Sequence, residues 1–397
     1  MNESLNNLTK DWRIVADDMI LTQSLPTTAG SKMLEGYESP LESEALTRLL
    51  ASGYTLVGKT DVGEFAIDLV GETSFKGVHT FNGTIKNATA ETIVSGNASA
   101  ALCLEVNGSV RRASAQSGLV SIKPTYGTVS RYGVIPVVSS GDTVSILASR
   151  TDVCREILSS IAGHDEKDGT SLPDGICATL KSDTQHTSLH RIALLSTLTH
   201  GIDATVHEWL DDAVKKLRES GVTVDVIENG VIAAARPAWN VLLCAELCKN
   251  VARYDGVRYG YRAKDFSGID ELYTNSRTEA FGELLKTAIL FGSETLSNEN
   301  YTKVYDKSLR VRRVITEEFA KIFEEYDAIL LPACSTSSYT EEQITADTYL
   351  AFKENLYTAP ASIAGLPAVV AGGVQLIGSP LSELTLLDAA EIIERRD

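Results

Sequence analysis

Short runs of branched apolar residues alternate along this chain with longer amphipathic segments, and this alternation limits the possible folds most. Segment 191–196 predicts a strand, 203–219 an amphipathic helix with acidic residues in its early turns, and 222–227 a second strand. Strands that are separated by helices usually join into a parallel or mixed sheet with helices on both faces. The sequence therefore predicts an α/β fold.

The same patterns predict the remaining main elements. Helices are expected over 42–51, 142–162, 234–254 and 307–325, and strands over 54–58, 119–122 and 328–332. The helix at 142–162 is expected to end at Gly163, and the strand at 328–332 is expected to stop at its own proline.

The domain organisation is predicted to be simple. The 397 residues contain no Pro-, Ser- or Gly-rich linker, no internal repeat and no low-complexity block, so we expect one domain over 1–397 with a short lead at 1–11. A net charge of −17 argues against a nucleic-acid-binding surface, because phosphate contacts need clustered Lys and Arg. The sequence shows neither a membrane span nor a readable targeting peptide. The six cysteines and six histidines show no metal-ligand spacing, so no metal site is expected.

A turn with the sequence Asn107-Gly108-Ser109 lies before the strand predicted at 119–122. Glycine lets the backbone approach a ligand closely, and consecutive backbone N–H groups in such a turn can hold an oxyanion. We therefore interpret Ser109 as a candidate nucleophile, and Asn107 and Gly108 as candidate oxyanion-hole residues. For the tripeptide alone, an ordinary surface turn is the alternative interpretation.

Longer motifs extend this interpretation beyond the tripeptide. They are Gly58-Lys-Thr-Asp-Val-Gly-Glu-Phe65, Lys123-Pro-Thr-Tyr-Gly127, Ser130-Arg-Tyr-Gly133, Ile161-Ala-Gly-His-Asp165, Ala252-Arg-Tyr-Asp-Gly-Val-Arg-Tyr-Gly260 and Gln375-Leu-Ile-Gly378. Together with the Ser109 turn, they resemble the amidase signature family over nearly the whole chain, and within it the organellar tRNA-dependent amidotransferase subunits. The resemblance implies a single-domain fold with a large, mixed, twisted β-sheet that helices cover on both faces.

The resemblance also implies a Ser–cis-Ser–Lys triad, in which a neutral lysine accepts a proton through a bridging serine and the nucleophile forms an acyl-enzyme. Matched by position, Ser109 is the nucleophile, and Asn107 and Gly108 occupy the glycine positions before it. Ser95 matches the bridging cis-Ser, with Ser99 as the last serine of the same run. Such a site uses neither metal nor histidine.

The chain departs from the family pattern in the catalytic region. The connection from Ser99 to Ser109 is about ten residues short, equivalent to roughly 15 Å of helix, so we expect a gap or a shifted register in the sheet. Asp17 stands at the position of the family lysine. An unperturbed pKa of about 4 makes this carboxylate a weak base, and its negative charge opposes an oxyanion. Lys59, in the Gly-Lys-Thr motif, is the alternative base.

Substrate recognition is affected by a further departure. Arg312 matches the arginine that the family is thought to pair with the α-carboxylate of glutamine, although a helix-surface arginine is the alternative interpretation. The loop that would carry an acidic residue for the α-ammonium group is reduced to Val370-Ala-Gly. The loop therefore offers no acidic residue for the α-ammonium group of free glutamine.

The resemblance implies a glutaminase subunit in mitochondrial translation. Glutamine would be hydrolysed at Ser109, and the ammonia would convert Glu-tRNA(Gln) to Gln-tRNA(Gln) on a B subunit that binds ATP and Mg²⁺, with a small third subunit in the complex. This chain itself is expected to hold no cofactor and to lie in the mitochondrial matrix. Because Asp17 replaces the lysine, a catalytically impaired homologue is the alternative, either a structural subunit or a truncated gene model. A stand-alone amidase for another small amide is a further alternative.

Overall fold

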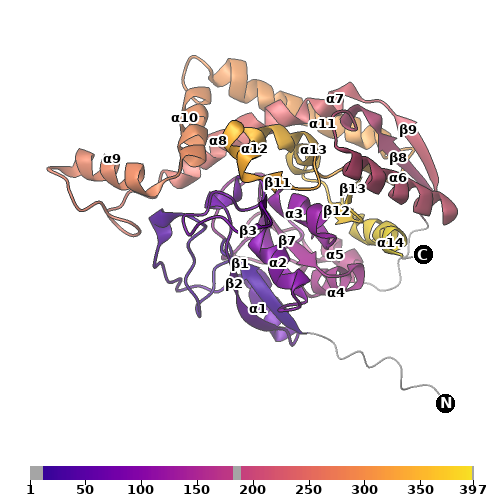
Figure 1. The fold of residues 1–397 in the computed structure, drawn as a ribbon, viewed down its shortest axis with the longest axis horizontal. Coiled ribbons are helices and arrows are strands. Elements are labelled where there is room, and N and C mark those ends of the chain that lie inside the picture. Colours follow the sequence, from indigo (N-terminus) through magenta and orange to yellow (C-terminus); the bar gives the residue numbers. More distant parts are fainter. Residues whose placement is uncertain (1–11, 182–188, 396–397) are drawn as a thin grey trace.

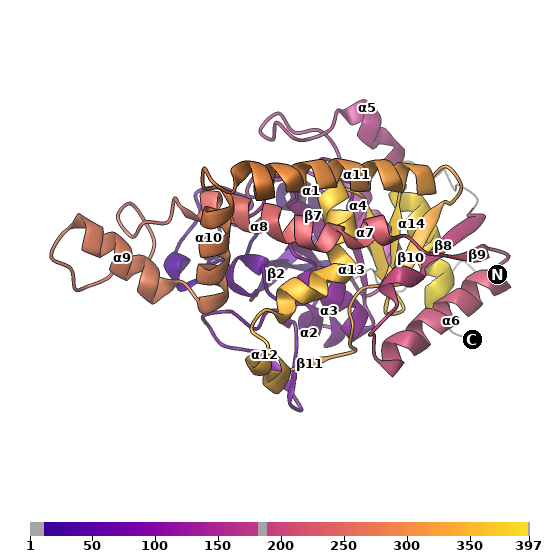
Figure 2. The ribbon, with the colours of Figure 1, turned by 90° about the horizontal axis from the view of Figure 1, so that it is seen from above.

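The computed structural model describes residues 12–181 and 189–395, so the predicted lead at 1–11 lies outside the described residues. Within these ranges, a mixed sheet of ten strands forms the centre of the molecule, and helices lie on both of its faces (Figures 1 and 2). Helix α9 (Ile269–Ala280) projects from this body in both views. The predicted α/β fold with a large mixed sheet is confirmed.

The strand order brings distant parts of the sequence side by side. From one edge to the other, the strands are β2 (Thr55–Thr60), β1 (Arg13–Asp17), β5 (Ala100–Glu105), β7 (Thr143–Ala148), β6 (Val120–Lys123), β12 (Ala368–Ala371), β13 (Val374–Gly378), β10 (Ala328–Pro332), β8 (Arg191–Leu195) and β9 (Thr223–Ile227). Pairing is parallel among β2, β1 and β5 and among β10, β8 and β9, and antiparallel between the central strands. A small sheet contains β3 (Thr80–Phe81), β4 (Thr84–Ile85) and β11 (Tyr339–Thr340).

The remaining helices connect and cover these strands. They are α1 (Glu44–Ala51), α2 (Ala88–Val94), α3 (Ser109–Ser117), α4 (Thr151–Ile161), α5 (Asp174–Cys177), α6 (Ala204–Glu219), α7 (Gly230–Ala233), α8 (Ala235–Val251), α10 (Glu283–Thr295), α11 (Asp306–Ile322), α12 (Glu341–Ala346), α13 (Leu350–Ala364) and α14 (Glu383–Glu394). Most of the helices and strands predicted from the sequence are present, with ends that differ by a few residues.

Strand β5 separates two hydrophobic clusters because successive side chains of a strand point to opposite faces of the sheet. Ala101 and Cys103 pack in one cluster with side chains of α2 and α3. Leu102 and Leu104 belong to the main core, which also contains the buried side chains of α1 and α4. The helix that begins at Ser109 therefore covers the same face of the sheet as α2.

The predicted helix over 142–162 is wrong in its first half. Residues Thr143–Ala148 form strand β7, and only Thr151–Ile161 form a helix. Periodicity does not distinguish a continuous apolar run in a buried strand from one in a buried helix. Pairing decides the outcome, because β7 lies between β5 and β6 and hydrogen-bonds to both.

Of the expected gap or shifted register, the sheet shows no gap before Ser109, while the register of β1 with β2 shifts between Ile14 and Val15. The chain passes from α2 directly into β5, and all six residues of β5 pair in continuous register with β7, from Ala100 opposite Ala148 to Glu105 opposite Thr143. The sheet tolerates the short connection because the strand itself is retained.

The short loop near Val370 is a tight hairpin. Strands β12 and β13 pair up to Ala371 and Val374, and the two residues between them are Gly372, with φ of +57°, and Gly373, with φ of +83°. A two-residue turn of this kind requires positive φ at both positions, which favours glycine. Neither turn residue carries a charge for substrate recognition.

One long apolar segment packs as a core helix. Residues Gly230–Val251 are long and apolar enough to cross a membrane by composition, but 56% of their most apolar window is buried inside the fold. Trp239, Leu242 and Leu243 are almost completely buried, and α8 packs against α10, α11 and α13. Burial against neighbouring helices explains the apolar composition of this segment.

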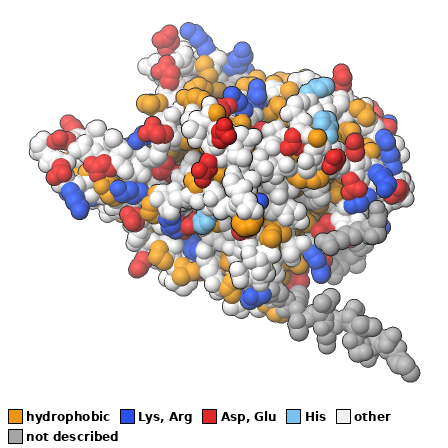
Figure 3. Space-filling model, in the orientation of Figure 1, with side chains coloured by type: hydrophobic (Ala, Val, Ile, Leu, Met, Phe, Trp, Pro, Cys, Tyr) orange, Lys and Arg blue, Asp and Glu red, His pale blue; other side chains and the backbone are white. Residues whose placement is uncertain are grey.

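The visible surface carries mixed charge. On the face in Figure 3, Lys and Arg side chains are interspersed with Asp and Glu side chains. A face of this kind lacks the clustered positive charge that contacts to nucleic-acid phosphates require.

Candidate active site

The turn before α3 has a geometry that only glycine accepts comfortably. Gly108 has φ of +93°, and a Cβ atom there would lie 2.4 Å from Oγ1 of Thr358 on α13. The first hydrogen bond of α3 runs from the Arg112 N–H to the Gly108 carbonyl at 2.9 Å. Ser109 is therefore the first residue of the helix, and it is 7% exposed.

The backbone around Ser109 offers free donors. The N–H groups of Asn107, Gly108 and Ser109 donate to no acceptor among the described residues. The N–H groups in the first turn of a helix have no partner within the helix, and the helix dipole favours negative charge there. Such N–H groups can receive an oxyanion, and the oxyanion-hole role of Asn107 and Gly108 stays a prediction.

The Asn107 side chain fixes this turn against its surroundings. Its Nδ2 donates to the Ile67 carbonyl at 2.8 Å, and its Oδ1 accepts from Nε1 of Trp239 at 3.3 Å. The Thr358 hydroxyl donates to the Asn107 carbonyl at 3.4 Å. Helices α8 and α13 thus hold the turn in place.

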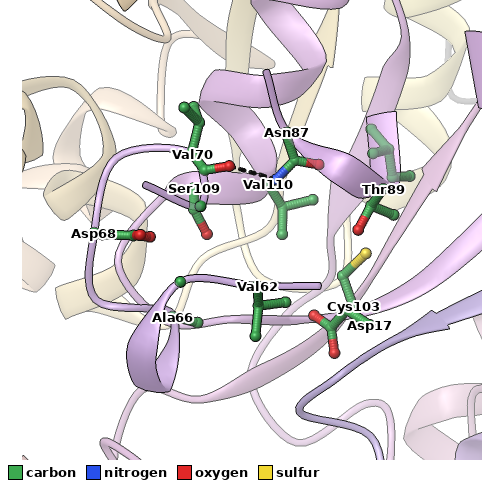
Figure 4. Close-up of a pocket in the computed structure, with 13 residues that line it drawn as sticks. Asp17, Val62, Ala66, Asp68, Val70, Asn87, Thr89, Cys103, Ser109 and Val110 are labelled. Carbon is green, nitrogen blue, oxygen red and sulfur yellow. Dashed lines mark hydrogen bonds between the residues drawn. The ribbon is translucent and has the colours of Figure 1, made fainter. Parts of the chain in front are cut away.

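Ser109 lines a small cavity, which Figure 4 shows. Its volume is about 10 Å³, roughly the room for one water. The polar side chains in its lining belong to Asp17, Asp68, Asn87, Thr89 and Ser109, and the others to Val62, Ala66, Val70, Cys103, Val110 and Leu147. The Ser109 hydroxyl forms no hydrogen bond with any residue that the structure describes.

The structure brings Asp17 and Ser109 to the same cavity, although they lie far apart in the sequence. Asp17 ends β1, and its Oδ1 and Oδ2 accept the backbone N–H groups of Met19 at 3.0 Å and Leu104 at 2.8 Å. Burial raises the pKa of Asp17 to about 7. Asp17 therefore ties β1 to β5, and both of its oxygens already accept a backbone hydrogen bond.

Lys59 does not line the cavity. Its Nζ lies 3.0 Å from Asp18, 2.6 Å from the Thr27 hydroxyl and 3.1 Å from the Pro26 carbonyl. Burial lowers the pKa of Lys59, while the Asp18 carboxylate opposes this shift. The Lys59 amino group, which the sequence offered as the alternative base, is therefore already engaged by these three oxygens.

Ser95 also lies outside the cavity. It ends α2 on the surface, where its hydroxyl donates to the Glu91 carbonyl at 2.5 Å. A residue earlier in α2, Thr89, lines the cavity instead. The Thr89 hydroxyl shares a 2.6 Å hydrogen bond with the Thr60 hydroxyl. This geometry does not support the bridging role predicted for Ser95.

Arg312 is engaged at another site. It lies on α11 and donates to Oγ of Ser140 at 3.1 Å and to the Ser140 carbonyl at 3.2 Å. The neighbouring Gly141 packs against the Trp239 ring, since a Cβ atom there would lie 2.3 Å from the indole. Because Trp239 also contacts Asn107, its indole lies between the Ser109 turn and the loop that Arg312 holds. The substrate-binding role of Arg312 stays a prediction.

Two further groups near Ser109 were not predicted as site residues. Glu105 pairs with Arg111 at 3.1 Å, and both side chains are fully buried, so this ion pair joins the end of β5 to the first turn of α3. Asp68 lines the cavity three residues after the Gly58–Phe65 motif. No spacing rule marked Asp68, since only the folded loop directs it towards Ser109.

The described residues contain no cluster of three or more His, Cys, Asp or Glu side chains that could hold a metal ion. The polar groups that line the cavity include the Ser109 hydroxyl, the carboxyl groups of Asp17 and Asp68 and the hydroxyl of Thr89, and backbone N–H donors lie at the Ser109 turn. This combination suits acyl transfer, in which a serine attacks a carbonyl carbon and N–H groups stabilise the oxyanion.

Comparison with known proteins agrees with this interpretation. The family profile described as Amidase matches residues 14–387. The chain is 35% identical over 407 residues to the A subunit of glutamyl-tRNA(Gln) amidotransferase from Streptococcus pneumoniae strain 70585, over 98% of this chain and 83% of that protein. It is 34% identical to the protein of the same name from Lachnoclostridium phytofermentans, over 96% of this chain and 82% of that one.

Solved structures show the same fold. The A subunit of glutamyl-tRNA(Gln) amidotransferase from Thermotoga maritima matches with a TM-score of 0.79 and 26% identity, over 96% of this chain and 82% of that chain. The Kluyveromyces lactis urea amidolyase matches with a TM-score of 0.80 over 96% of this chain and 22% of that one, and its 21% identity supports the fold alone. By the extent of the family match and the identity to these relatives, the chain belongs to the amidase family.

Proposed function

We propose that this chain is the glutaminase subunit of a glutamyl-tRNA(Gln) amidotransferase and that it hydrolyses the glutamine side-chain amide through an acyl-enzyme on Ser109. The observation that carries the proposal is the placement of Ser109 at the start of α3, beside free backbone N–H groups and against a cavity with two carboxyl groups. Family membership and the amidotransferase relatives support an amidase or amidotransferase enzyme.

The proposed reaction follows from the residues around the turn. The Ser109 hydroxyl attacks the amide carbon, and the backbone N–H groups of the turn receive the oxyanion, a contribution of about 3 kcal/mol per donor. Collapse of the tetrahedral intermediate releases ammonia and leaves an ester on Ser109, which water then hydrolyses. A volume of about 10 Å³ has room for roughly one water, so lining residues must move before an amide group reaches Ser109.

The wider role is part of the same proposal. The relatives are named as one subunit of an amidotransferase, which implies a complex with other subunits. In the proposed complex, a B subunit holds ATP and Mg²⁺ and uses the ammonia to convert Glu-tRNA(Gln) to Gln-tRNA(Gln), and a small third subunit completes the assembly. The proposed location is the mitochondrial matrix. Fractionation of cells that express a C-terminally tagged chain tests this location.

A catalytically impaired homologue is the competing function, and specific observations favour it. No lysine lines the cavity, Lys59 is engaged with Asp18, and Ser95 lies on the surface. An impaired homologue would keep the fold and the contacts to its partners while Ser109 stays unreactive. Sequencing the transcript determines whether the short segments near Ser99 and Val370 belong to the natural chain.

Glutamine-dependent ammonia release by the purified chain with its partner subunits tests the proposal. We expect Ser109→Ala to abolish release, while Ser117→Ala, at the other end of the same helix, keeps the wild-type rate. Trapping with hydroxylamine should yield the glutamyl hydroxamate only from an enzyme with an intact Ser109. Equal rates for wild type and Ser109→Ala would instead favour the impaired homologue, and release of ammonia only from other small amides would favour a stand-alone amidase.

A further inference from the structure

Asp68 lines the cavity that contains Ser109, and one of its carboxyl oxygens has no hydrogen-bond partner among the described residues. Its side chain is completely buried, and Oδ2 accepts the backbone N–H and the hydroxyl of Thr73, both at 2.9 Å. Oδ1 is buried and has no hydrogen-bond partner among the described residues. Figure 4 shows the Asp68 carboxyl group directed into the cavity on the side where Ser109 lies.

The surrounding backbone leaves room for this carboxyl group. A Cβ atom on Gly63 would lie 1.6 Å from Oδ2 of Asp68, so a side chain at 63 and the observed Asp68 conformation exclude each other. A buried polar atom without a partner is unfavourable, because it has lost its hydrogen bonds to water and gained none in the protein. The fold therefore holds Asp68 at an unfavourable position that a ligand or a reacting group can relieve.

Helix α3 fixes the position of Asp68 relative to Ser109. Arg112 lies one turn after Ser109, and its guanidinium donates to the carbonyls of Asp68 at 2.9 Å and Leu69 at 3.0 Å. Residues three apart lie on the same side of a helix. The loop that carries Asp68 is thus bound to the side of α3 on which Ser109 begins.

The two carboxyl groups of the cavity are not equivalent. Both oxygens of Asp17 accept backbone N–H groups, and this bonding joins two strands. Asp68 keeps one oxygen without a partner among the described residues. A proton acceptor needs a free lone pair, and Asp68 keeps a carboxyl oxygen without a hydrogen bond, whereas each Asp17 oxygen already accepts one.

We propose that Asp68 is the group that accepts the proton of Ser109, in place of the lysine that Asp17 replaces. This inference rests on the proposed function. As the Ser109 Oγ–carbon bond forms, the hydroxyl proton moves to Oδ1 of Asp68. The same proton moves to the nitrogen as the carbon–nitrogen bond breaks, and ammonia leaves. Water then gives a proton to Asp68 while its oxygen attacks the ester, and that proton returns to Ser109 when the carboxylic acid leaves.

The electrostatic surroundings of Asp68 suit this role. Burial and the nearby Glu72 carboxylate raise its pKa to about 8, while the Thr73 hydrogen bonds and Arg112 lower it in part. Asp17 and Cys103 face Asp68 across the cavity, and burial raises the pKa of both. A base is most effective when its pKa lies near the working pH, so this carboxyl group is a far better base than an ordinary aspartate.

The rate at which a fluorophosphonate probe labels Ser109 in the assembled complex tests the proposal. Asp68→Asn keeps the shape and an oxygen for Thr73, and we expect it to slow labelling by about 100-fold or more. Asp142→Asn is the matched control, because Asp142 is equally buried, accepts the N–H groups of Val137 and Val138, and lies outside the cavity. In wild type, the labelling rate should rise with pH through the neutral range.

The outcomes separate this inference from the proposed function. Suppose that the wild type releases ammonia and that Asp68→Asn is labelled at a rate within about threefold of the wild-type rate. This result would overturn the role of Asp68 and leave the proposed function standing. Wild type that neither labels nor releases ammonia would sink both. If Asp68→Asn fails to fold, the pH dependence of the wild-type labelling rate tests the proposal instead. A wild-type labelling rate that is independent of pH through the neutral range contradicts the proposal. Recovery of Asp68→Ala by added formate, a small carboxylate, would support it.

Discussion

Gly108→Ala tests whether the nucleophile turn depends on the absence of a side chain. The new Cβ would lie 2.4–2.6 Å from three side-chain atoms of Thr358. Thr358 has little freedom to move away, because its hydroxyl donates to the Asn107 carbonyl and accepts from Arg112 at 3.3 Å. A left-handed conformation costs a non-glycine residue about 1–2 kcal/mol, and overpacking costs about 1–3 kcal/mol. We expect the free energy of unfolding to fall by about 2–5 kcal/mol.

Gly118→Ala is the matched control at the other end of α3. Gly118 has φ of +64°, but a Cβ atom there would meet no atom within 4 Å, so only the conformational cost of about 1–2 kcal/mol applies. Urea denaturation followed by tryptophan fluorescence measures both variants, since Trp239 contacts the turn. Equal losses for the two variants would refute the packing argument. Gly108→Ala should also lower the rate of Ser109 labelling, whereas Gly118→Ala should not.

Three further predictions concern buried charges. Arg111→Met leaves the buried Glu105 without its partner and should lower the free energy of unfolding by about 3–5 kcal/mol, part of which Glu105→Gln restores in the double variant measured by urea denaturation. The raised pKa values of Asp17, about 7, and Asp68, about 8, mean that the folded chain keeps protons that the unfolded chain releases above about pH 4. Stability from these groups is present below about pH 4 and is lost as pH rises through 7 and 8, so Asp68→Asn should flatten the decline in urea midpoint between about pH 5 and 8.5. Burial lowers the pKa of Lys123 to about 7, so above that pH the unfolded chain binds more protons than the folded chain does. Stability should therefore rise between about pH 7 and 10, and Lys123→Met should remove this rise. Thermal unfolding at several pH values measures the effect.

Local patterns predicted much of the fold because each helix or strand with a clear period carries its own signal. Segment 203–219 shows an apolar face with helical spacing, and it forms α6. The apolar run at 143–148 has no such face, since both of its sides are buried, and only pairing with β5 and β6 makes it a strand. Information of this kind lies in contacts between distant segments.

Some residues of the candidate site were also predictable from local sequence, and others were not. Ser109 and Gly108 were recognised because a glycine turn has a short local signature, but the helix α3 that begins at Ser109 was not predicted. Thr89 and Asp68 were missed because nothing in their immediate sequence marks them. They reach the cavity only through the orientation of α2 and of the loop that Arg112 holds.

The sequence by itself determined the α/β class, the amidase resemblance and the position of the candidate nucleophile turn, because periodicity and short motifs act over neighbouring residues. Tertiary structure alone decided which side chains meet Ser109. It buried Asp17 against backbone N–H groups and left Ser95 on the surface. It also engaged Lys59 with Asp18 and placed Asp68, with one unpartnered carboxyl oxygen, in the lining of the cavity. Proton transfer depends on distances of a few ångströms between residues far apart in the chain, and only the packing of strands and helices sets those distances.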